Sequence, residues 1–339
     1  MKKSILLAAS IIFAISVNAQ KVALHSTSGV RFFNGTAGFV NAYQAAAAGD
    51  TIYLPGGGFT SPGSINKKLF VYGAGHYPDS TQVTSKTILT GSINLTGDAD
   101  GFHIEGVDFT GGITTTTNEA VDQITIKYCR FQGEVNIRGD RSNPSTNLLL
   151  INNVLQSNLR LTNAQNAGIF NSIFNSGIVD TYGNLFQNNL FLLNNYSSYS
   201  YAYTITGDNN TLENNIFLRT ADREIAGNSN ILKYNITPKA SPFWGDNPIT
   251  DSNYTSVDLT SIFVNQTGNV FSYAHDYHLQ SPDIYLGVDG TQAGIYGGTF
   301  VYKDGAVPSN PHFSKKNIAA TTDENGLLHI EISVAAQDK

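Results

Sequence analysis

The stretch NTLENNIF at residues 210–217 places two adjacent asparagines, Asn214 and Asn215, directly before the apolar pair Ile216 and Phe217. Asparagine is unfavourable in both helices and strands, so the pair indicates a bend between two buried segments. Six further segments share the apolar start, the polar or small middle and the apolar end: IEGVDF (104–109), IKYCRF (126–131), LINNVL (150–155), IFNSIF (169–174), FQNNLF (186–191) and LKYNIT (232–237). They recur about every 21 residues, a period typical of a solenoid.

The bend predicts a stacked corner. Its second position is occupied by Val107, Cys129, Asn153, Ser172, Asn189, Asn215 and Asn235, and four of these residues follow Asn152, Asn171, Asn188 and Asn214. Stacked asparagines donate and accept hydrogen bonds along the stack, and asparagine tolerates the left-handed backbone of a sharp corner. We therefore expect the apolar pair after each bend to re-enter the core.

A second set of segments repeats with the same period. Its members mostly alternate apolar and polar residues and then turn at Gly or Asn: INLTGD (93–98), ITTTTN (113–118), VNIRGD (135–140), LRLTNA (159–164), VDTYGN (179–184), YTITGD (203–208) and REIAGN (223–228). Three short strands per turn predict an all-β, right-handed, single-stranded parallel β-helix. The alternative, an antiparallel sandwich or barrel, does not need Asn or Gly at a fixed phase.

The stretches FVNAYQAAAAGDTIYLPGGGF (39–59) and KKLFVYGAG (67–75) resemble the opening of the pectin-lyase-like β-helix superfamily, with a short capping helix, a Gly-Asp turn and a first strand ending in Gly. Phe39, Ala42, Tyr43 and Ala46 fall on one helical face and would cover the open end of the solenoid. The resemblance covers about residues 36–240. It implies an exported protein with a carbohydrate connection.

The first residues predict export. Lys2 and Lys3 precede an apolar run from Ile5 to Val17 and a small-residue cleavage site, so we expect a signal peptide at 1–19, cleaved after Ala19, and a secreted, periplasmic or cell-surface protein. No other apolar run approaches the ~20 residues of a membrane span. The remaining chain is expected to comprise a β-helix domain at 20–300, with a cap at 36–48, regular coils at about 50–240 and irregular last coils at 241–300, and a tail at 301–339 with one strand.

Composition narrows the range of partners. The net charge is −6 and charged residues make up only 14% of the chain, which argues against nucleic acid or an anionic membrane as partner. Cys129 is the only cysteine, so no disulfide framework is possible. The expected partner is a polysaccharide or cell-surface glycan. Nothing in the sequence predicts the oligomeric state.

In enzymes of this superfamily the active groove lies on one parallel sheet, where outward side chains of adjacent coils, ~4.8 Å apart, form a row. In the second set of segments, Arg138 and Arg160 are candidates to bind a uronate carboxylate or to act as a lyase-type base, with Asp180 as partner and Tyr182 as a stacking or proton-donating group. Glu224 would lie two coils from Asp180, about 9.6 Å away at the usual strand spacing, which is near the upper end of the separation in an inverting glycosidase. Alternatively, Arg160 and Asp180 form an ordinary cross-strand ion pair.

Two aromatic loops are further candidates for substrate binding. The first carries Tyr196, Tyr199 and Tyr201 within NNYSSYSYAY (194–203), and the second carries Trp244 within SPFWGDNP (241–248). Exposed aromatic rings stack on sugars, but the tyrosines could equally pack a strand and the tryptophan could close the core.

No cofactor or metal is expected. Calcium would need clustered carboxylates, whereas Asp98, Asp140 and Asp208 are explained as turn residues. His275 and His278 lack further metal ligands nearby in the sequence.

Two functions from different classes follow. The first is a polysaccharide lyase or glycoside hydrolase, although the NTD, GHG and RIK motifs of polygalacturonase-like enzymes are absent, so whether the chain is an enzyme stays open. The second is a non-catalytic surface or adhesion scaffold with a face that binds carbohydrate or protein.

Overall fold

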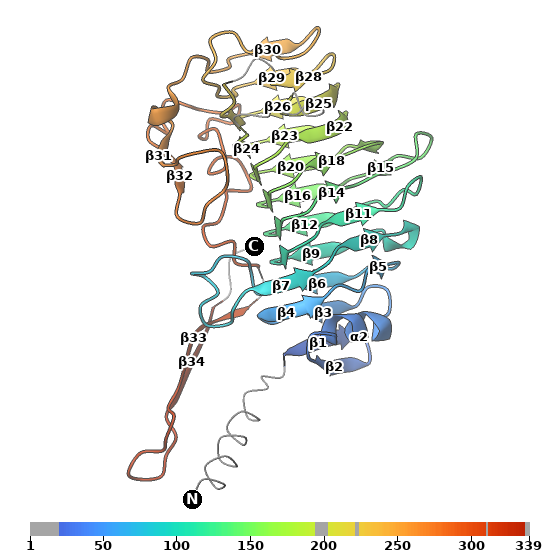
Figure 1. Cartoon of the computed structure of the whole chain (residues 1–339), viewed down its shortest axis with the longest axis vertical. Coiled ribbons are helices and arrows are strands. Elements are labelled where there is room, and N and C mark those ends of the chain that lie inside the picture. The colour runs from blue at the N-terminus through green and yellow to red at the C-terminus, as the bar shows by residue number, and fades with distance from the viewer. Residues whose placement is uncertain (1–19, 194–202, 221–223, 310, 336–339) are drawn as a thin grey trace, which may run out of the picture.

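The computed structural model describes residues 20–193, 203–220, 224–309 and 311–335. The chain forms a parallel β-helix of about nine turns, with about 22 residues per turn (Figure 1). The predicted fold class is confirmed, because neighbouring strands along the stack pair in parallel rather than as the hairpins of a sandwich. Among the described residues helix is scarce.

Three sheets run along the solenoid. Sheet A has twelve strands in the order β2 (Gly29–Asn34), β1 (Lys21–Ser26), β3 (Thr51–Tyr53), β6 (Phe70–Tyr72), β9 (His103–Glu105), β12 (Thr125–Lys127), β16 (Leu149–Ile151), β20 (Gly168–Phe170), β23 (Leu185–Gln187), β26 (Thr211–Glu213), β29 (Ile231–Lys233) and β30 (Ile249–Asp251). Sheet B has eight strands, namely β4 (Gly57–Thr60), β7 (Thr87–Thr90), β10 (Asp108–Phe109), β13 (Arg130–Phe131), β17 (Val154–Leu155), β21 (Ile173–Phe174), β24 (Leu190–Phe191) and β27 (Ile216–Phe217). Sheet C has eight strands, namely β5 (Ser64–Ile65), β8 (Ile93–Leu95), β11 (Ile113–Thr115), β14 (Val135–Asn136), β18 (Leu159–Arg160), β22 (Ile178–Tyr182), β25 (Ile205–Asp208) and β28 (Ile225–Ala226).

The corner between sheets A and B is an asparagine ladder. Asn214 has a φ of 59° and makes the left-handed turn, while the side chain of Asn215 points into the stack. The Nδ2 of Asn215 donates to Oδ1 of Asn235 (3.0 Å), and its own Oδ1 accepts from Nδ2 of Asn189 (3.0 Å) and from the Asn189 backbone N–H (2.9 Å). Buried polar groups are stable only when paired in this way, so the ladder lets the chain turn inside a dry core.

The two apolar residues after the corner point in opposite directions, because successive residues of a strand do so. Phe217 enters the inner core, where it stacks on Phe191 with ring centroids 4.8 Å apart. Ile216 faces outward into a second hydrophobic core. The sequence pattern predicts that both residues enter one core, whereas the outer face of sheet B forms a second one.

A segment at residues 257–309, which we call the strap, covers that outer face. It contains the short helix η3 (Leu259–Ser261) and the antiparallel pair β31 (Phe263–Asn265) and β32 (Asp276–Leu279). Instead of forming last coils, it runs back towards the N-terminal end, held by the first asparagine of four corners, namely Asn152, Asn171, Asn188 and Asn214. The Nδ2 of Asn171 donates to the carbonyls of Ile295 and Gly297 (both 2.8 Å), and that of Asn152 donates to the Phe300 carbonyl (2.9 Å).

The two ends of the solenoid differ. At the N-terminal end the helix α2 (Gly38–Ala45) buries Phe39 and Ala42 against the first coils, as the sequence predicts. There, β1 pairs antiparallel with β2 and β3. At the other end β30 adds one more strand to sheet A.

After the strap the chain forms an antiparallel hairpin, β33 (His312–Ile318) and β34 (Ile330–Ala335), which projects from the body (Figure 1). Three small elements complete the described chain: β15 (Ser145–Thr146), β19 (Ala164–Gln165) and the 3-10 helix η1 (Gly97–Ala99).

Candidate functional site

The outward face of sheet A carries aromatic side chains at its N-terminal end. Consecutive strands align Phe32, Ala23, Tyr53 and Tyr72 in one row, which continues through Glu105. Each of these positions neighbours an inward apolar residue such as Ile52 or Val71, so strand alternation directs their side chains outward.

Tyr53 and Tyr72 stand side by side on this face. Their ring centroids are 5.6 Å apart with an interplanar angle of 21°, and both rings are partly exposed. Within the described part of the chain, no protein group forms a hydrogen bond with either hydroxyl. The pair therefore offers apolar ring edges and two free polar groups to a ligand.

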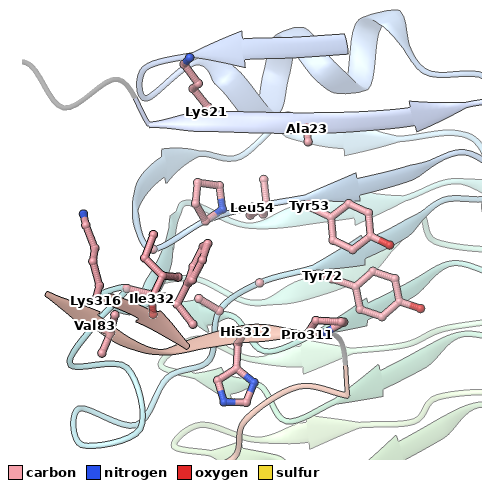
Figure 2. A pocket seen from close by; sticks show the side chains of 16 residues that line it. Lys21, Ala23, Tyr53, Leu54, Tyr72, Val83, Pro311, His312, Lys316 and Ile332 are labelled. Atoms are coloured by element: carbon pink, nitrogen blue, oxygen red, sulfur yellow. The ribbon is translucent and has the colours of Figure 1, made fainter. Parts of the chain in front are cut away.

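A groove of about 540 Å³ lies beside the two tyrosines (Figure 2). Sheet A and its following loop form one wall with Leu54 and Pro55, and the hairpin forms the other with Phe313 and Ile332. Lys21 and Lys316 line the groove, whereas none of the described Asp or Glu residues does so. On a protein with a net charge of −6, this is a locally cationic and largely apolar cleft.

An ionic cluster adjoins the tyrosines. Glu105 is 2% exposed and accepts from His103 Nε2 (2.8 Å) and from Ser309 Oγ (2.8 Å), while Lys127 Nζ lies 3.8 Å from Glu105 Oε1. His103 also contacts Tyr72, with ring centroids 5.4 Å apart. The cluster thus connects the aromatic row to the strap.

The electrostatics keep Glu105 ionised. Burial would raise the pKa of Glu105, but the hydrogen bonds from His103 and Ser309 and the charges of His103 and Lys127 outweigh burial and lower it. The pKa of Tyr72 is raised by burial and by the Glu105 carboxylate. The phenol therefore stays protonated at neutral pH and can donate a hydrogen bond.

The sequence-predicted residues on sheet C mostly form ion pairs or hydrogen bonds with one another or with neighbouring side chains. Arg160 Nε contacts Glu134 Oε1 (3.1 Å) and Arg160 Nη1 contacts Asp180 Oδ2 (2.5 Å), so the cross-strand ion pair is present. Arg138 donates to Asn136 Oδ1 and to Thr117 Oγ1, both at 2.9 Å.

The register of sheet C differs from the predicted row at one strand. Arg160 of β18 pairs with Val179 of β22 rather than with Asp180. Asp180, with a φ of 57°, occupies a bulge where the pairing of β22 with β25 shifts between Ile178 and Thr181. Tyr182, two residues further, is 49% exposed on this open face.

Glu224 and Trp244 lie inside the protein rather than on the sheet C face. Glu224 is fully buried beneath Lys239, with Nζ 3.3 Å from Oε1, and it accepts the Phe243 N–H (3.0 Å). Burial raises the pKa of its carboxyl group. Trp244 packs edge-on against Phe217 and closes the C-terminal end of the core. Tyr196, Tyr199 and Tyr201 lie outside the described residues.

A second ionic cluster fixes the strap to sheet B. Arg130 Nη1 contacts both carboxylate oxygens of Asp108 (3.0 and 3.1 Å), and Lys86 Nζ lies 4.6 Å from the centre of the Tyr273 ring. The Tyr273 hydroxyl donates to the carbonyl of His76 (3.0 Å), whose ring is fully buried with a pKa lowered by burial to about 3. Each of these side chains contacts another member of the cluster, although His76 Nε2 and Arg130 Nε have no hydrogen-bond partner within the described residues, and we assign the cluster a structural role.

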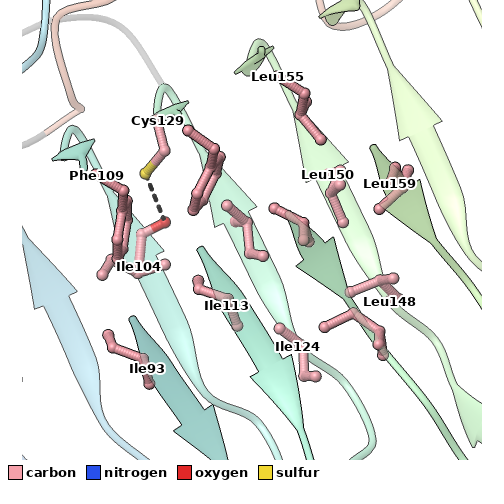
Figure 3. Packing of buried hydrophobic residues seen from close by; sticks show 14 of the residues in the cluster. Ile93, Ile104, Phe109, Ile113, Ile124, Cys129, Leu148, Leu150, Leu155 and Leu159 are labelled. Atoms are coloured by element: carbon pink, nitrogen blue, oxygen red, sulfur yellow. Dashed lines mark hydrogen bonds between the residues drawn. The ribbon is translucent and has the colours of Figure 1, made fainter. Parts of the chain in front are cut away.

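The single thiol is not a nucleophile. Cys129 replaces asparagine in the corner ladder and lies among the apolar side chains of the inner core, with Sγ 4.0 Å from the Ile104 carbonyl (Figure 3). Burial raises the pKa of the thiol. A protonated, inaccessible thiol is chemically inert.

In the residue ranges described above, no three His, Cys, Asp or Glu side chains come together as a metal ion requires. The same residues contain no helix with the length and apolarity to cross a membrane. No family model matches the chain, and no curated protein or solved structure shows significant similarity to it.

Proposed function

We propose that this chain is an exported polysaccharide-binding β-helix, and that its binding face is the N-terminal end of sheet A rather than sheet C. The observation that carries the proposal is the Tyr53–Tyr72 pair beside the cationic groove. A sugar chain presents alternating hydroxyl and C–H surfaces, and carbohydrate sites match them with aromatic rings and a few polar groups. The resemblance to the pectin-lyase-like superfamily supports the same ligand class.

The geometry favours binding over catalysis. Glu105, the one carboxylate of the cluster, is already held by His103 and Ser309 and is almost completely buried. A general acid or base must reach the proton that it transfers, and this carboxylate is covered by its own partners. Lys21 and Lys316 extend the choice of ligand to acidic polysaccharides, whose carboxylates or sulfates they would neutralise.

The test is calorimetric titration of residues 20–339 with a panel of acidic and neutral polysaccharides. For a polysaccharide that binds, Tyr53→Ala combined with Tyr72→Ala should weaken the affinity roughly tenfold or more. Tyr182→Ala removes a comparably exposed tyrosine from sheet C and serves as the matched control, with unchanged affinity. Loss of binding in Tyr182→Ala alone would contradict the proposed face and favour the sheet C residues.

Processing can be followed in the same samples. Unsaturated products absorb in the ultraviolet and hydrolysis releases reducing ends, so both signals are recorded during incubation. The proposal predicts binding without either signal. A product signal that disappears in Arg160→Ala would place a lyase on sheet C and overturn the proposed function.

A further inference from the structure

The hairpin of β33 and β34 is amphipathic, and beyond its base at Phe313 and Ile332, which lines the groove, its apolar face has no partner within the described chain. Direct cross-strand neighbours share a face, and the pairs Ile318–Ile330, Lys316–Ile332 and Phe313–Val334 are apolar except for one lysine. The opposite face carries Asn317–Glu331 and Lys315–Ser333. On the apolar face, the exposed fractions are 49% for Phe313, 48% for Ile318, 47% for Leu328, 56% for Ile330, 52% for Ile332 and 60% for Val334.

Such an element needs a covering surface. An isolated two-stranded hairpin is marginally stable in water, and contiguous exposed apolar side chains mark interaction sites. The base of the hairpin lies over the groove beside sheet A through Phe313 and Ile332. Its remaining length extends past the N-terminal end of the solenoid (Figure 1).

A second unpaired apolar surface lies at the same end of the molecule. The strand β2 is the terminal strand of sheet A, so no strand in the described part of the chain pairs with one of its edges. Val30 is 49% and Phe32 is 64% exposed, and both project from the outward face because they pair with His25 and Ala23. Open edges and exposed apolar strands promote pairing with another chain.

We propose that two copies of this chain form a two-fold dimer through their N-terminal ends, in which the hairpin of each copy covers Val30 and Phe32 of the other. Both complementary surfaces belong to one chain and lie at one end, which is the condition for a closed, isologous interface. Because the hairpin passes the end of its own solenoid, it reaches the position of a second copy stacked there.

The available area suits a stable dimer. Six half-exposed apolar side chains per copy, four on the hairpin beyond the groove and two on β2, would bury roughly 400–750 Å² of apolar surface in the pair. At the apolar fraction typical of homodimers, this corresponds to a total interface of roughly 600–1,150 Å². Specific interfaces begin at about 1,000 Å².

Sedimentation velocity of residues 20–339 over a wide concentration range tests the proposal. The unmodified chain should be a dimer. Ile318→Lys combined with Ile330→Lys should raise the dimer dissociation constant more than about a hundredfold. The matched control, Asn317→Lys combined with Ser333→Lys, adds the same charge to the polar face and should stay dimeric.

A second variant keeps the test valid if the substituted hairpin fails to fold. Phe32→Lys leaves the hairpin sequence intact and should also give a monomer. A chain that is monomeric at every concentration, including one that instead binds lipid vesicles, would overturn the proposal. So would a dimer that survives both the hairpin and the Phe32 variants, because its interface would lie elsewhere.

Discussion

Replacing Asn215 by alanine tests the asparagine ladder, the element that gives the sequence repeat its structural meaning. The Asn215 side chain is fully buried and makes four hydrogen bonds: it donates to the Phe186 carbonyl (2.9 Å) and to Asn235 Oδ1 (3.0 Å), and it accepts the backbone N–H and the Nδ2 of Asn189. Alanine removes all four.

The magnitude follows from the groups left without partners. The Oδ1 of Asn235 still accepts the backbone N–H of residue 215, and the Asn189 amide keeps its bond to the Ile169 carbonyl, but the Asn189 N–H and the Phe186 carbonyl lose a partner inside the core. Each unsatisfied buried polar group costs about 1–3 kcal/mol, so for these two groups we expect the free energy of unfolding to fall by about 2–6 kcal/mol.

Urea denaturation followed by tryptophan fluorescence measures this loss. Trp244 is the only tryptophan and contacts Phe217, two residues beyond the ladder, so it reports on the affected coils. Asn317→Ala, at an exposed hairpin position, is the control and should change the free energy by less than about 0.5 kcal/mol. A loss below about 1 kcal/mol for Asn215→Ala would refute the reasoning, since the ladder would then contribute no more than a surface contact.

Four further changes have defined outcomes. Phe191→Ala removes a ring stacked between Phe174 (5.0 Å) and Phe217 (4.8 Å) and should lower the free energy of unfolding by about 3–5 kcal/mol in urea denaturation. Glu105→Gln should lower the free energy of unfolding at neutral pH. Because the folded-state pKa of Glu105 is lowered, the difference in free energy of unfolding from the unmodified chain should shrink as the pH falls below about 4. A difference that grows on acidification would contradict the ionised state. Asn171→Gly keeps the left-handed backbone (φ 46°) but removes the bonds to Ile295 and Gly297, so hydrogen exchange should accelerate at residues 292–297 and not at Phe186. Arg160→Ala breaks an exposed ion pair and should cost about 1 kcal/mol or less, so a larger loss would show a structural role that the exposure does not suggest.

The sequence predicts the solenoid because its corners are chemically specific. Asn152, Asn171, Asn188 and Asn214 all adopt the left-handed conformation, and the residues that follow them form the interior stack. Such positions repeat with each coil, so periodicity alone reveals them. The capping helix is predictable for a similar reason, because Phe39 and Ala42 lie one turn apart on an apolar face.

The strap was not predictable from the repeat. Its attachment uses the asparagines that already explain the corner, and its apolar contacts use Ile216 and Ile173, which the pattern assigns to a single core. Nothing local in residues 257–309 identifies the sheet that they cover, since packing between segments far apart in the sequence has no periodic signal.

The candidate site lies on sheet A, whereas the predicted site residues Arg138, Arg160 and Asp180 belong to the second set of segments, which forms sheet C. Tyr53, Tyr72 and Glu105 lie one residue after the inward residues Ile52, Val71 and Ile104, so an alternation count on the first strand of each coil could have placed them on one face. The groove itself needs the hairpin, whose position depends on the strap. Strict alternation of apolar and polar residues likewise does not predict the bulge at Asp180.

Hydrogen–deuterium exchange of residues 20–339, with and without a polysaccharide that binds in the calorimetric panel, tests the proposed binding face most directly. The account predicts slower exchange on binding at residues 51–53, 70–72 and 103–105, with no change at 136–138 and 160–162. Protection confined to residues 136–138 and 160–162 would contradict the account and move the binding face to sheet C.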